Sequence, residues 1–189
     1  YGTTREQMAQ VCVQSRDHAV RHPASPMTKR ITIDDVLNSK PIAEPLNMLD
    51  CCLISDSAGA FIVTSADRAA DLPNNPAWLL GIGECHTHEH VTMAPSLTRY
   101  GAVESGQAAY SMAGLGPDDM DFAELYDCFS VVPIIEAEEL GLAERGAGGE
   151  LFTSGAATIE GRMPINTHGG MLSFAQAGAS GGLHAIVEA

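Results

Sequence analysis

Positive charge is scarce in this chain of 189 residues. Its 10 Lys and Arg stand against 24 Asp and Glu, a formal net charge of −14. So few cations cannot neutralise a phosphate backbone or an anionic membrane surface, so we expect neither nucleic-acid nor membrane partners. The sequence also lacks an apolar run of membrane length and a signal peptide. Its five cysteines form no disulfide or zinc spacing, which favours a reducing cytoplasm.

Apolar side chains are nevertheless abundant enough for a folded core. They make up 45% of the residues, which places the chain in the globular class. The chain begins at Tyr1 rather than at a methionine and ends at Ala189 inside an apolar run without a helix stop signal. We therefore interpret it as an incomplete fragment and expect the isolated fragment to be inactive.

Local signals predict alternating helices and strands. A capping box at Thr4, followed by apolar residues at helical spacing as far as Pro23, predicts a first helix, and Thr32 or Asp34 begins a short one over 33–37. Further apolar patterns predict buried strands over 49–65 and 78–86, short strands over 122–126 and 163–166, and helices over 96–115, 129–141 and from about 178. The alternation predicts an α/β layer structure, with an internal boundary in the Pro- and Asn-rich stretch 67–76.

Tyr126 and Asp127 fall where a predicted strand ends and a helix begins, a position that opens onto the crevice beside a sheet. A phenol there can donate a hydrogen bond to a thioester oxygen, or act as an acid or base if its pKa is pulled well below about 10. The structural alternative is that Tyr126 packs its ring and Asp127 caps the following helix.

Other groups with possible chemistry lie upstream and downstream. Six of the ten cations fall in the first forty residues, and Lys29 and Arg30 among them are candidates for the phosphates of a ligand, the alternative being a solvated surface. His168 can exchange a proton near neutral pH or can hold the loop through Gly169 and Gly170 by a backbone hydrogen bond. The two glycines permit either a close ligand or a tight turn.

A run of alternating histidines imitates a metal site. His86, His88 and His90 would share one face of a strand, with Glu84 and Glu89 nearby. Solvated histidines at a strand end explain the run equally well, and we predict no metal.

Three ordered motifs resemble the thiolase superfamily, in particular its sterol-carrier or lipid-transfer type. The segment 124–130 (Glu-Leu-Tyr-Asp-Cys-Phe-Ser) is similar to the His-Asp-Cys-Phe segment of those enzymes, and 166–173 (Asn-Thr-His-Gly-Gly-Met-Leu-Ser) to the Asn-x-x-Gly-Gly stretch before their Gly-His-Pro motif. The segment 49–60 resembles the closing strand of their N-terminal half. The resemblance covers nearly the whole chain.

The resemblance implies a layered αβαβα fold of two similar halves, with residues 1–72 from the end of the first half and 73–189 from a truncated second half. It also implies a dimer acting on coenzyme A thioesters, with no permanently bound cofactor, coenzyme A being part of the substrate. A small partner protein with an oligonucleotide-binding-type fold and a zinc ribbon often accompanies such enzymes. The family's nucleophilic and proton-shuttling cysteines lie outside this chain.

The chain departs from the family at two positions. Tyr126 stands where the family has His, and Gln176 replaces the histidine of Gly-His-Pro. Gln176 can donate a hydrogen bond to an oxyanion but cannot exchange a proton. We therefore expect Tyr126, Asp127, His168 and Gln176 to form the catalytic site, converging on a cavity for the pantetheine arm. Lys29, Arg30, Gly169 and Gly170 are expected to bind the coenzyme A portion.

Three functions follow from the resemblance. The first is a thiolase-like acyltransferase that makes or breaks a carbon–carbon bond next to the thioester carbonyl, and we favour it slightly. The second is a retro-aldolase on a β-hydroxyacyl thioester with an aromatic or steroid side chain, because tyrosines serve such aldolases. The third is a lipid-binding or scaffold subunit without catalysis, because the Gly-His-Pro histidine is lost.

Overall fold

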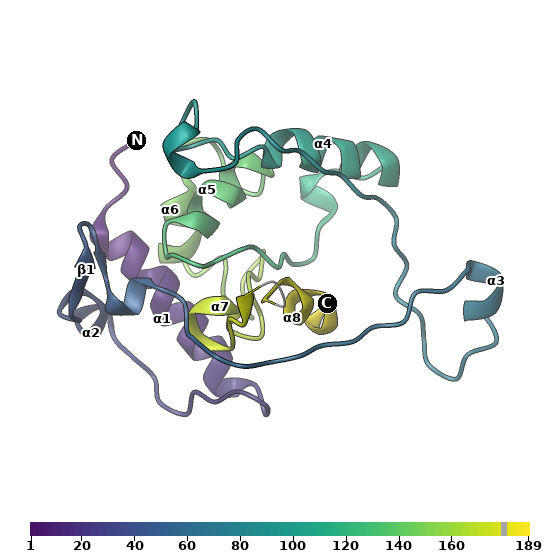
Figure 1. Ribbon diagram of the computed structural model, residues 1–189, viewed down its shortest axis with the longest axis horizontal. Coiled ribbons are helices and arrows are strands. Elements are labelled where there is room, and N and C mark those ends of the chain that lie inside the picture. Colours follow the sequence, from purple (N-terminus) through teal and green to yellow (C-terminus); the bar gives the residue numbers. More distant parts are fainter. Residues whose placement is uncertain (179–180) are drawn as a thin grey trace.

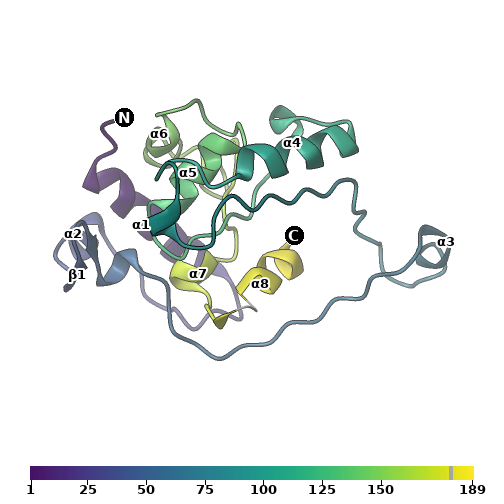
Figure 2. The same ribbon diagram turned by 45° about the horizontal axis from the view of Figure 1, so that its top comes forward.

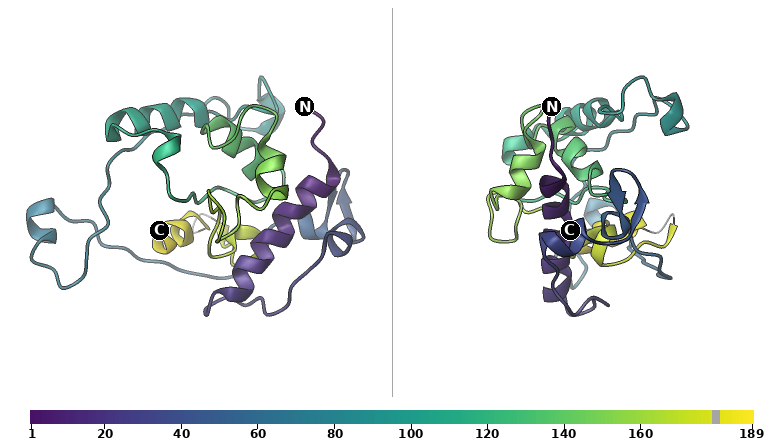
Figure 3. Two further views of the ribbon diagram at one scale, coloured as in Figure 1. Left: turned by 180° about the vertical axis from the view of Figure 1, so that it is seen from behind. Right: turned by 90° about the vertical axis from the view of Figure 1, so that its left-hand side faces the viewer.

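The structure, a computed structural model, describes residues 1–178 and 181–189. Helix α1, Arg5–Arg21, runs through the folded part and contacts α2, Ile33–Leu37, α6, Gly148–Thr153, and α7, Gly170–Ser173 (Figures 1 and 3). The other elements are the antiparallel pair β1, Pro41–Ala43, and β2, Leu46–Asn47, the helices α3, Ala66–Ala69, α4, Ala102–Ala113, α5, Val132–Glu139, and α8, Gly181–Glu188, and 3-10 turns at Met48–Asp50, Val91–Met93 and Pro117–Asp119. No helix among the described residues has both the length and the apolar character needed to cross a bilayer.

The predicted start of α1 is confirmed. The Thr4 hydroxyl accepts a hydrogen bond from the Gln7 N–H at 3.2 Å, and the Gln7 side-chain oxygen accepts one from the Thr4 N–H at 2.9 Å. This reciprocal pair is a capping box. Thr32 caps α2 in the same way, with Asp35 as its partner. Both helices begin where the sequence predicts because a capping box needs only residues three positions apart.

The buried core forms between the inner face of α1 and the helices of the second half of the chain. Val11 and Cys12 of α1 pack with Ile134 of α5, Phe152 of α6 and Leu172 of α7, all at most 3% exposed. Burying each large apolar side chain of this kind contributes roughly 1.5–3 kcal/mol. This packing fixes α7, and with it the segment before α7, against α1.

A buried ion pair joins the start of α1 to the 3-10 turn Met48–Asp50. Asp50 is fully buried and receives the Arg5 guanidinium in a two-pronged contact at 3.1 and 2.7 Å. Its carboxylate also accepts the Ser130 hydroxyl at 2.7 Å and the Asn47 N–H at 2.9 Å. Burial opposes ionisation of Asp50, but these hydrogen bonds outweigh it and hold its pKa below the ordinary value.

The predicted buried strands over 49–65 and 78–86 are wrong for this structure. Beyond Leu53 and Ser55, whose N–H groups bond to Met171 and Gln176 carbonyls, the chain leaves the core, passes through α3 and returns to α4 (Figures 1 and 2). Ile62 is 91% exposed there and Leu79 is 80% exposed. A strand needs a neighbouring strand to accept its backbone hydrogen bonds, and among the described residues these two segments have only the single bridge of Cys51 with Phe129.

Other predicted elements are present in shortened form. The strands expected over 122–126 and 163–166 lie parallel but share a single bridge, Ala123 with Ile165. The helices expected over 96–115 and 129–141 are trimmed to α4 and α5, because Gly101 and Gly114 flank α4 at positive φ and Pro133 lies in the first turn of α5. The last helix was expected from about 178. It begins at Gly181, and positions 179 and 180 lie outside the described residues.

Candidate functional site

Tyr126 lies just after the bridge between Ala123 and Ile165 and is 47% exposed. Its N–H donates to the Glu136 carboxylate at 2.9 Å, and its hydroxyl contacts the Cys128 thiol. Partial burial, together with the bond to Cys128, raises the pKa of Tyr126 to about 12. The phenol therefore keeps its proton at neutral pH, so it can donate a hydrogen bond, but the condition for a base is not met.

Asp127 points away from solvent and holds α7 in place. Only 1% exposed, it accepts the Met171 N–H at 2.6 Å and the Leu172 N–H at 3.3 Å. Burial raises its pKa to about 6, although these two backbone bonds pull the value down. Asp127 thus caps a helix, as the structural alternative held, but the helix is α7 rather than the one that follows it in sequence.

The two glycines before α7 allow backbones and side chains to approach closely. A Cβ at Gly169, where φ is +108°, would lie 2.5 Å from the Ala19 Cβ of α1. A Cβ at Gly170, where φ is +63°, would lie 2.0 Å from the Asp127 carboxylate. Glycine is needed here for the turn and the packing, and the predicted contact of both glycines with a ligand stays a prediction.

We expect Gly170→Ala to lower the free energy of unfolding by about 2 kcal/mol, because the new methyl group would displace Asp127 from the start of α7. The matched control is Gly114→Ala. Gly114 has nearly the same φ, +69°, but nothing lies within 4 Å of its added Cβ, so only the backbone cost of about 1 kcal/mol remains. Urea unfolding of both variants measures the difference. Equal losses would contradict the role given to the Gly170 and Asp127 contact.

His168 forms a buried pair with Glu124. The His168 Nδ1 lies 2.9 Å from a Glu124 carboxylate oxygen, and the two side chains are 6% and 7% exposed. The two atoms are close enough for an electrostatic contact, but their geometry does not meet the criteria of a hydrogen bond. The other Glu124 oxygen accepts the Thr167 N–H at 2.9 Å. It also lies 2.9 Å from the Thr167 hydroxyl, whose single proton is donated either to Glu124 or to Glu188. The imidazole therefore has a fixed carboxylate neighbour, an arrangement that orients a base.

Gln176 is held through its backbone by the extended segment after Asp50. Its N–H donates to the Ser55 hydroxyl at 2.8 Å, and its carbonyl accepts the Ser55 N–H at 3.1 Å. Its side-chain oxygen is buried and has no hydrogen-bond partner among the described residues. A Cβ at Gly181 would come within 2.2 Å of that oxygen, so the first residue of α8 covers it.

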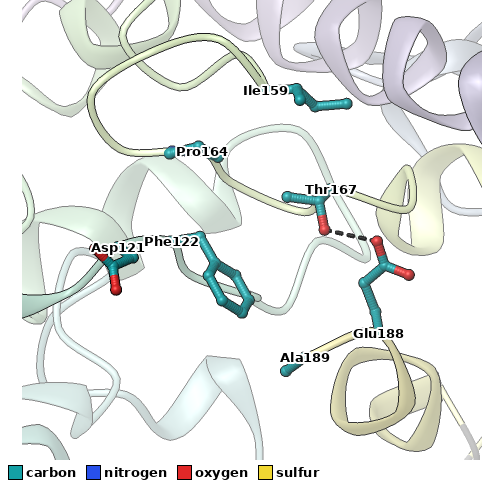
Figure 4. A pocket seen from close by; sticks show the side chains of 7 residues that line it. All are labelled: Asp121, Phe122, Ile159, Pro164, Thr167, Glu188 and Ala189. Carbon is teal, nitrogen blue, oxygen red and sulfur yellow. Dashed lines mark hydrogen bonds between the residues drawn. The ribbon is translucent and has the colours of Figure 1, made fainter.

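The structure brings Asp127, His168 and both glycines together around the start of α7, with Tyr126 beside Asp127 in the chain. A hollow of about 340 Å³ lies on the Thr167 side of this region. Thr167 and Glu188 share a 2.8 Å hydrogen bond across it, opposite Phe122 and Pro164 (Figure 4). Tyr126, His168 and Gln176 do not line this hollow, and their convergence on a pantetheine cavity stays a prediction.

Lys29 and Arg30 lie in the exposed loop after α1. Arg30 pairs with Asp17 of that helix at 3.5 Å. Their role in binding coenzyme A stays a prediction.

The alternating histidines are held one by one in an exposed segment. His86 contacts Glu84 at 2.7 Å, and His90 contacts Glu89 at 3.7 Å. His88 contacts the Thr87 hydroxyl at 2.7 Å. Across 1–178 and 181–189, His, Cys, Asp and Glu side chains form no group of three suited to a metal ion.

Two carboxylates near the site are not among the residues that the sequence predicts for it: Glu124, whose side chain is 7% exposed, and the partly buried Glu136. Besides Glu124, Glu136 of α5 accepts the Tyr126 N–H, and burial raises its pKa to about 7, helped by the nearby Asp127 and Glu139 carboxylates and opposed by the Tyr126 N–H bond. Each interrupts an apolar run, 122–125 for Glu124 and 131–137 for Glu136. A lone carboxylate inside an apolar run was the available signal, since burial of a charge requires a partner or a function.

Comparison with known proteins adds a family and several relatives. The family profile described as "Thiolase C-terminal domain-like" matches residues 83–189. The chain is 38% identical over 197 residues to a "Steroid side-chain-cleaving aldolase" of Thermomonospora curvata, covering 100% of this chain and 49% of that protein. It is 37% identical over 172 residues to an "Acetyl-CoA acetyltransferase" of Methanothermobacter thermautotrophicus, covering 90% of this chain and 45% of that protein.

A solved structure is similar over the whole chain. The "Ltp2-ChsH2(DUF35) aldolase" superposes with a TM-score of 0.89 at 35% identity, covering 100% of this chain and 50% of that chain. The predicted thiolase-like fold and the predicted resemblance are thereby confirmed. The chain spans about half the length of the relatives it matches.

Proposed function

Since this chain belongs to the thiolase C-terminal domain-like family, we propose that it is part of an enzyme that acts on a coenzyme A thioester and makes or breaks the carbon–carbon bond next to the thioester carbonyl. The observation that carries the proposal is the buried pair of Glu124 and His168, which lies directly before the glycine turn and α7. A site of this chemistry needs a base and donors for the thioester oxygen, and the chain has a candidate for each.

Within this chemistry we infer that the side chains favour retro-aldol cleavage over the acyl transfer that the sequence alone favours slightly. His168, oriented by Glu124, takes the proton of the β-hydroxyl group. The bond between Cα and Cβ then breaks, its electrons form a thioester enolate, and a carbonyl is left at Cβ. The neutral Tyr126 phenol and the Gln176 amide donate hydrogen bonds to the enolate oxygen, each worth about 3 kcal/mol in comparable sites. The protonated His168 returns this proton to the enolate carbon, which completes the reaction and restores the base. No step requires Gln176 to exchange a proton.

Acyl transfer is the second candidate, supported by the 37% identity to an acetyl-CoA acetyltransferase. The assay that separates the two uses the longest polypeptide that contains this chain. Release of an aldehyde or ketone from β-hydroxyacyl-CoA thioesters with aromatic or steroid side chains supports the aldolase. Cleavage of β-ketoacyl-CoA that depends on free coenzyme A supports acyl transfer. Failure of both, with and without a partner protein, would contradict the proposal and leave a scaffold or lipid-binding role.

We expect Tyr126→Phe to lower turnover about 100-fold, because one donor to the developing oxyanion is lost. The matched control is Tyr110→Phe on α4. The Tyr110 hydroxyl donates to the Leu140 carbonyl at 3.2 Å, so its loss affects stability by about 1 kcal/mol and leaves turnover unchanged. Steady-state kinetics of both variants tests the assignment, and unchanged turnover in Tyr126→Phe would show that the phenol has no role.

We also propose a homodimer in the cytoplasm and assembly with a small partner carrying an oligonucleotide-binding-type fold and a zinc ribbon. The similar Ltp2-ChsH2(DUF35) aldolase supports the partner, because its name joins two proteins. We place the division between the two thiolase halves near residue 73, ten residues before the family match begins.

A further inference from the structure

Two thiols face one another beside Tyr126. The segments 50–52 and 128–130 run antiparallel, with Cys51 opposite Phe129. The Cys52 N–H donates to the Cys128 carbonyl at 2.9 Å, and the Ser130 N–H donates to the Asp50 carbonyl at 3.0 Å. This register places Cys52 directly opposite Cys128, although the two are far apart in the sequence.

The spacing of directly opposed residues suits a disulfide. The bond from the Cys52 N–H to the Cys128 carbonyl makes this a hydrogen-bonded pair, the wider kind, whose Cα atoms lie roughly 5.5 Å apart with their side chains on the same face. A disulfide spans Cα separations of about 4.4–6.8 Å. Both thiols are free and only partly buried. Cys51, the neighbour of Cys52, projects to the opposite face of the pairing and cannot compete for Cys128.

Tyr126 lies beside this thiol pair. Its hydroxyl is close enough to the Cys128 thiol for that thiol to raise the pKa of the phenol, and Cys52 is close enough to act electrostatically on both Tyr126 and Cys128. Any reaction that moves the Cys128 sulfur towards Cys52 therefore changes the surroundings of the phenol.

We propose that Cys52 and Cys128 form a reversible disulfide that withdraws the Cys128 thiol from Tyr126 and lowers turnover. The oxidant is a small disulfide such as glutathione disulfide. One protein thiolate attacks it and releases one reduced glutathione, and the second thiolate attacks the mixed disulfide and releases another. Two protein thiols thus lose two protons and two electrons, and the oxidant gains both. The effect on turnover rests on the proposed role of Tyr126, whereas disulfide formation itself does not.

The reaction has a predictable pH dependence. Burial raises the pKa of both thiols above the ordinary value, and only the thiolate attacks a disulfide. Oxidation is therefore slow at neutral pH and becomes faster as the pH rises.

The test is peptide mapping of this chain after oxidation. The protein is incubated with glutathione disulfide at about pH 8.5, the remaining thiols are blocked, and a digest is analysed by mass spectrometry without reduction. We expect a link between the peptides containing Cys52 and Cys128 that dithiothreitol removes. The link should persist in Cys51→Ser, the adjacent control, and disappear in Cys52→Ser. Persistence in Cys52→Ser, glutathione adducts alone, or a link between two chains would overturn the proposal.

Turnover provides the second readout, in the longest polypeptide containing this chain. Oxidation should lower turnover at least about 10-fold and at most about 100-fold, which is the loss expected for Tyr126→Phe. The Cys52→Ser variant should keep its turnover both before and after oxidation. If the disulfide forms and turnover does not change, the proposal that the disulfide acts through Tyr126 is overturned. In that event the turnover of Tyr126→Phe shows which proposal fails. A slow variant supports the role of Tyr126 in the proposed function, and a fully active variant excludes that role.

Discussion

Replacing Arg5 with methionine is expected to lower the free energy of unfolding at pH 7 by about 3 to 5 kcal/mol, the usual cost of leaving a buried charge unpaired. Asp50 has no exposed surface, whereas Arg5 keeps 27% of its side chain in solvent. Removing the cation therefore leaves the carboxylate without a charged partner, with bonds from Ser130 and Asn47 and a weak one from the Cys12 thiol. Chemical denaturation followed by circular dichroism measures the loss.

The sign of the pH dependence provides a check. The pKa of Asp50 is held below its ordinary value, so the stabilisation is present above about pH 4 and is lost as the pH falls through the lowered pKa. The difference between wild type and Arg5→Met should therefore shrink in acid. Arg21→Met is the control on the same helix, because the pair of Arg21 with Glu160 is exposed and contributes less than about 1 kcal/mol. Equal losses in both variants would contradict the importance of the buried pair.

Replacing Glu136 with glutamine is expected to raise the free energy of unfolding by about 3 kcal/mol at pH 8, in contrast to the loss expected for Arg5→Met. Burial raises the pKa of Glu136 from 4.5 to about 7, and each tenfold change in an acid dissociation constant corresponds to about 1.4 kcal/mol. The unfolded chain releases this proton at lower pH than the folded chain, so the native carboxylate costs stability increasingly as the pH rises from about 4.5 to 7. Glutamine keeps an oxygen for the Tyr126 N–H and carries no charge.

The gain from Glu136→Gln should nearly vanish at pH 4, where the native side chain is protonated in both folded and unfolded states. Glu144→Gln serves as the control, because Glu144 is exposed and its replacement should change stability by less than about 0.5 kcal/mol at either pH. Thermal or urea unfolding at the two pH values gives the comparison. A gain of the same size at pH 4 and pH 8 would show that the effect does not come from the buried charge.

The sequence predicted those features that depend on neighbouring residues. The Thr4 and Thr32 capping boxes involve residues three positions apart, so the starts of α1 and α2 could be placed from local chemistry. The helical part of 96–115 was also visible in its spacing, although the glycines at its ends shortened it. The three motifs of the thiolase resemblance pointed to the fold that the comparisons confirm.

Long-range partners could not be predicted in the same way. Asp127 caps α7 more than forty residues later, and Glu124 lies beside His168 at a similar separation. The apolar run around Glu124 indicates a carboxylate that needs a partner, but nothing in the local pattern identifies His168 as that partner or α7 as the helix that Asp127 caps. The apolar runs over 49–65 and 78–86 failed for a related reason, since apolar content favours a strand but its formation depends on backbone partners elsewhere in space.

The position of Asp50 has one further consequence. A short antiparallel pairing with few hydrogen bonds can slip by one residue, and each slip turns every side chain to the other face. Here the residue at the end of the pairing is anchored through its carboxylate to Arg5 and Ser130. A slip by one residue would separate the Asp50 carboxylate from Arg5 and Ser130. The ion pair of Asp50 with Arg5, at the start of α1, thus keeps Cys52 opposite Cys128. The pattern of apolar residues around the two cysteines does not fix this register.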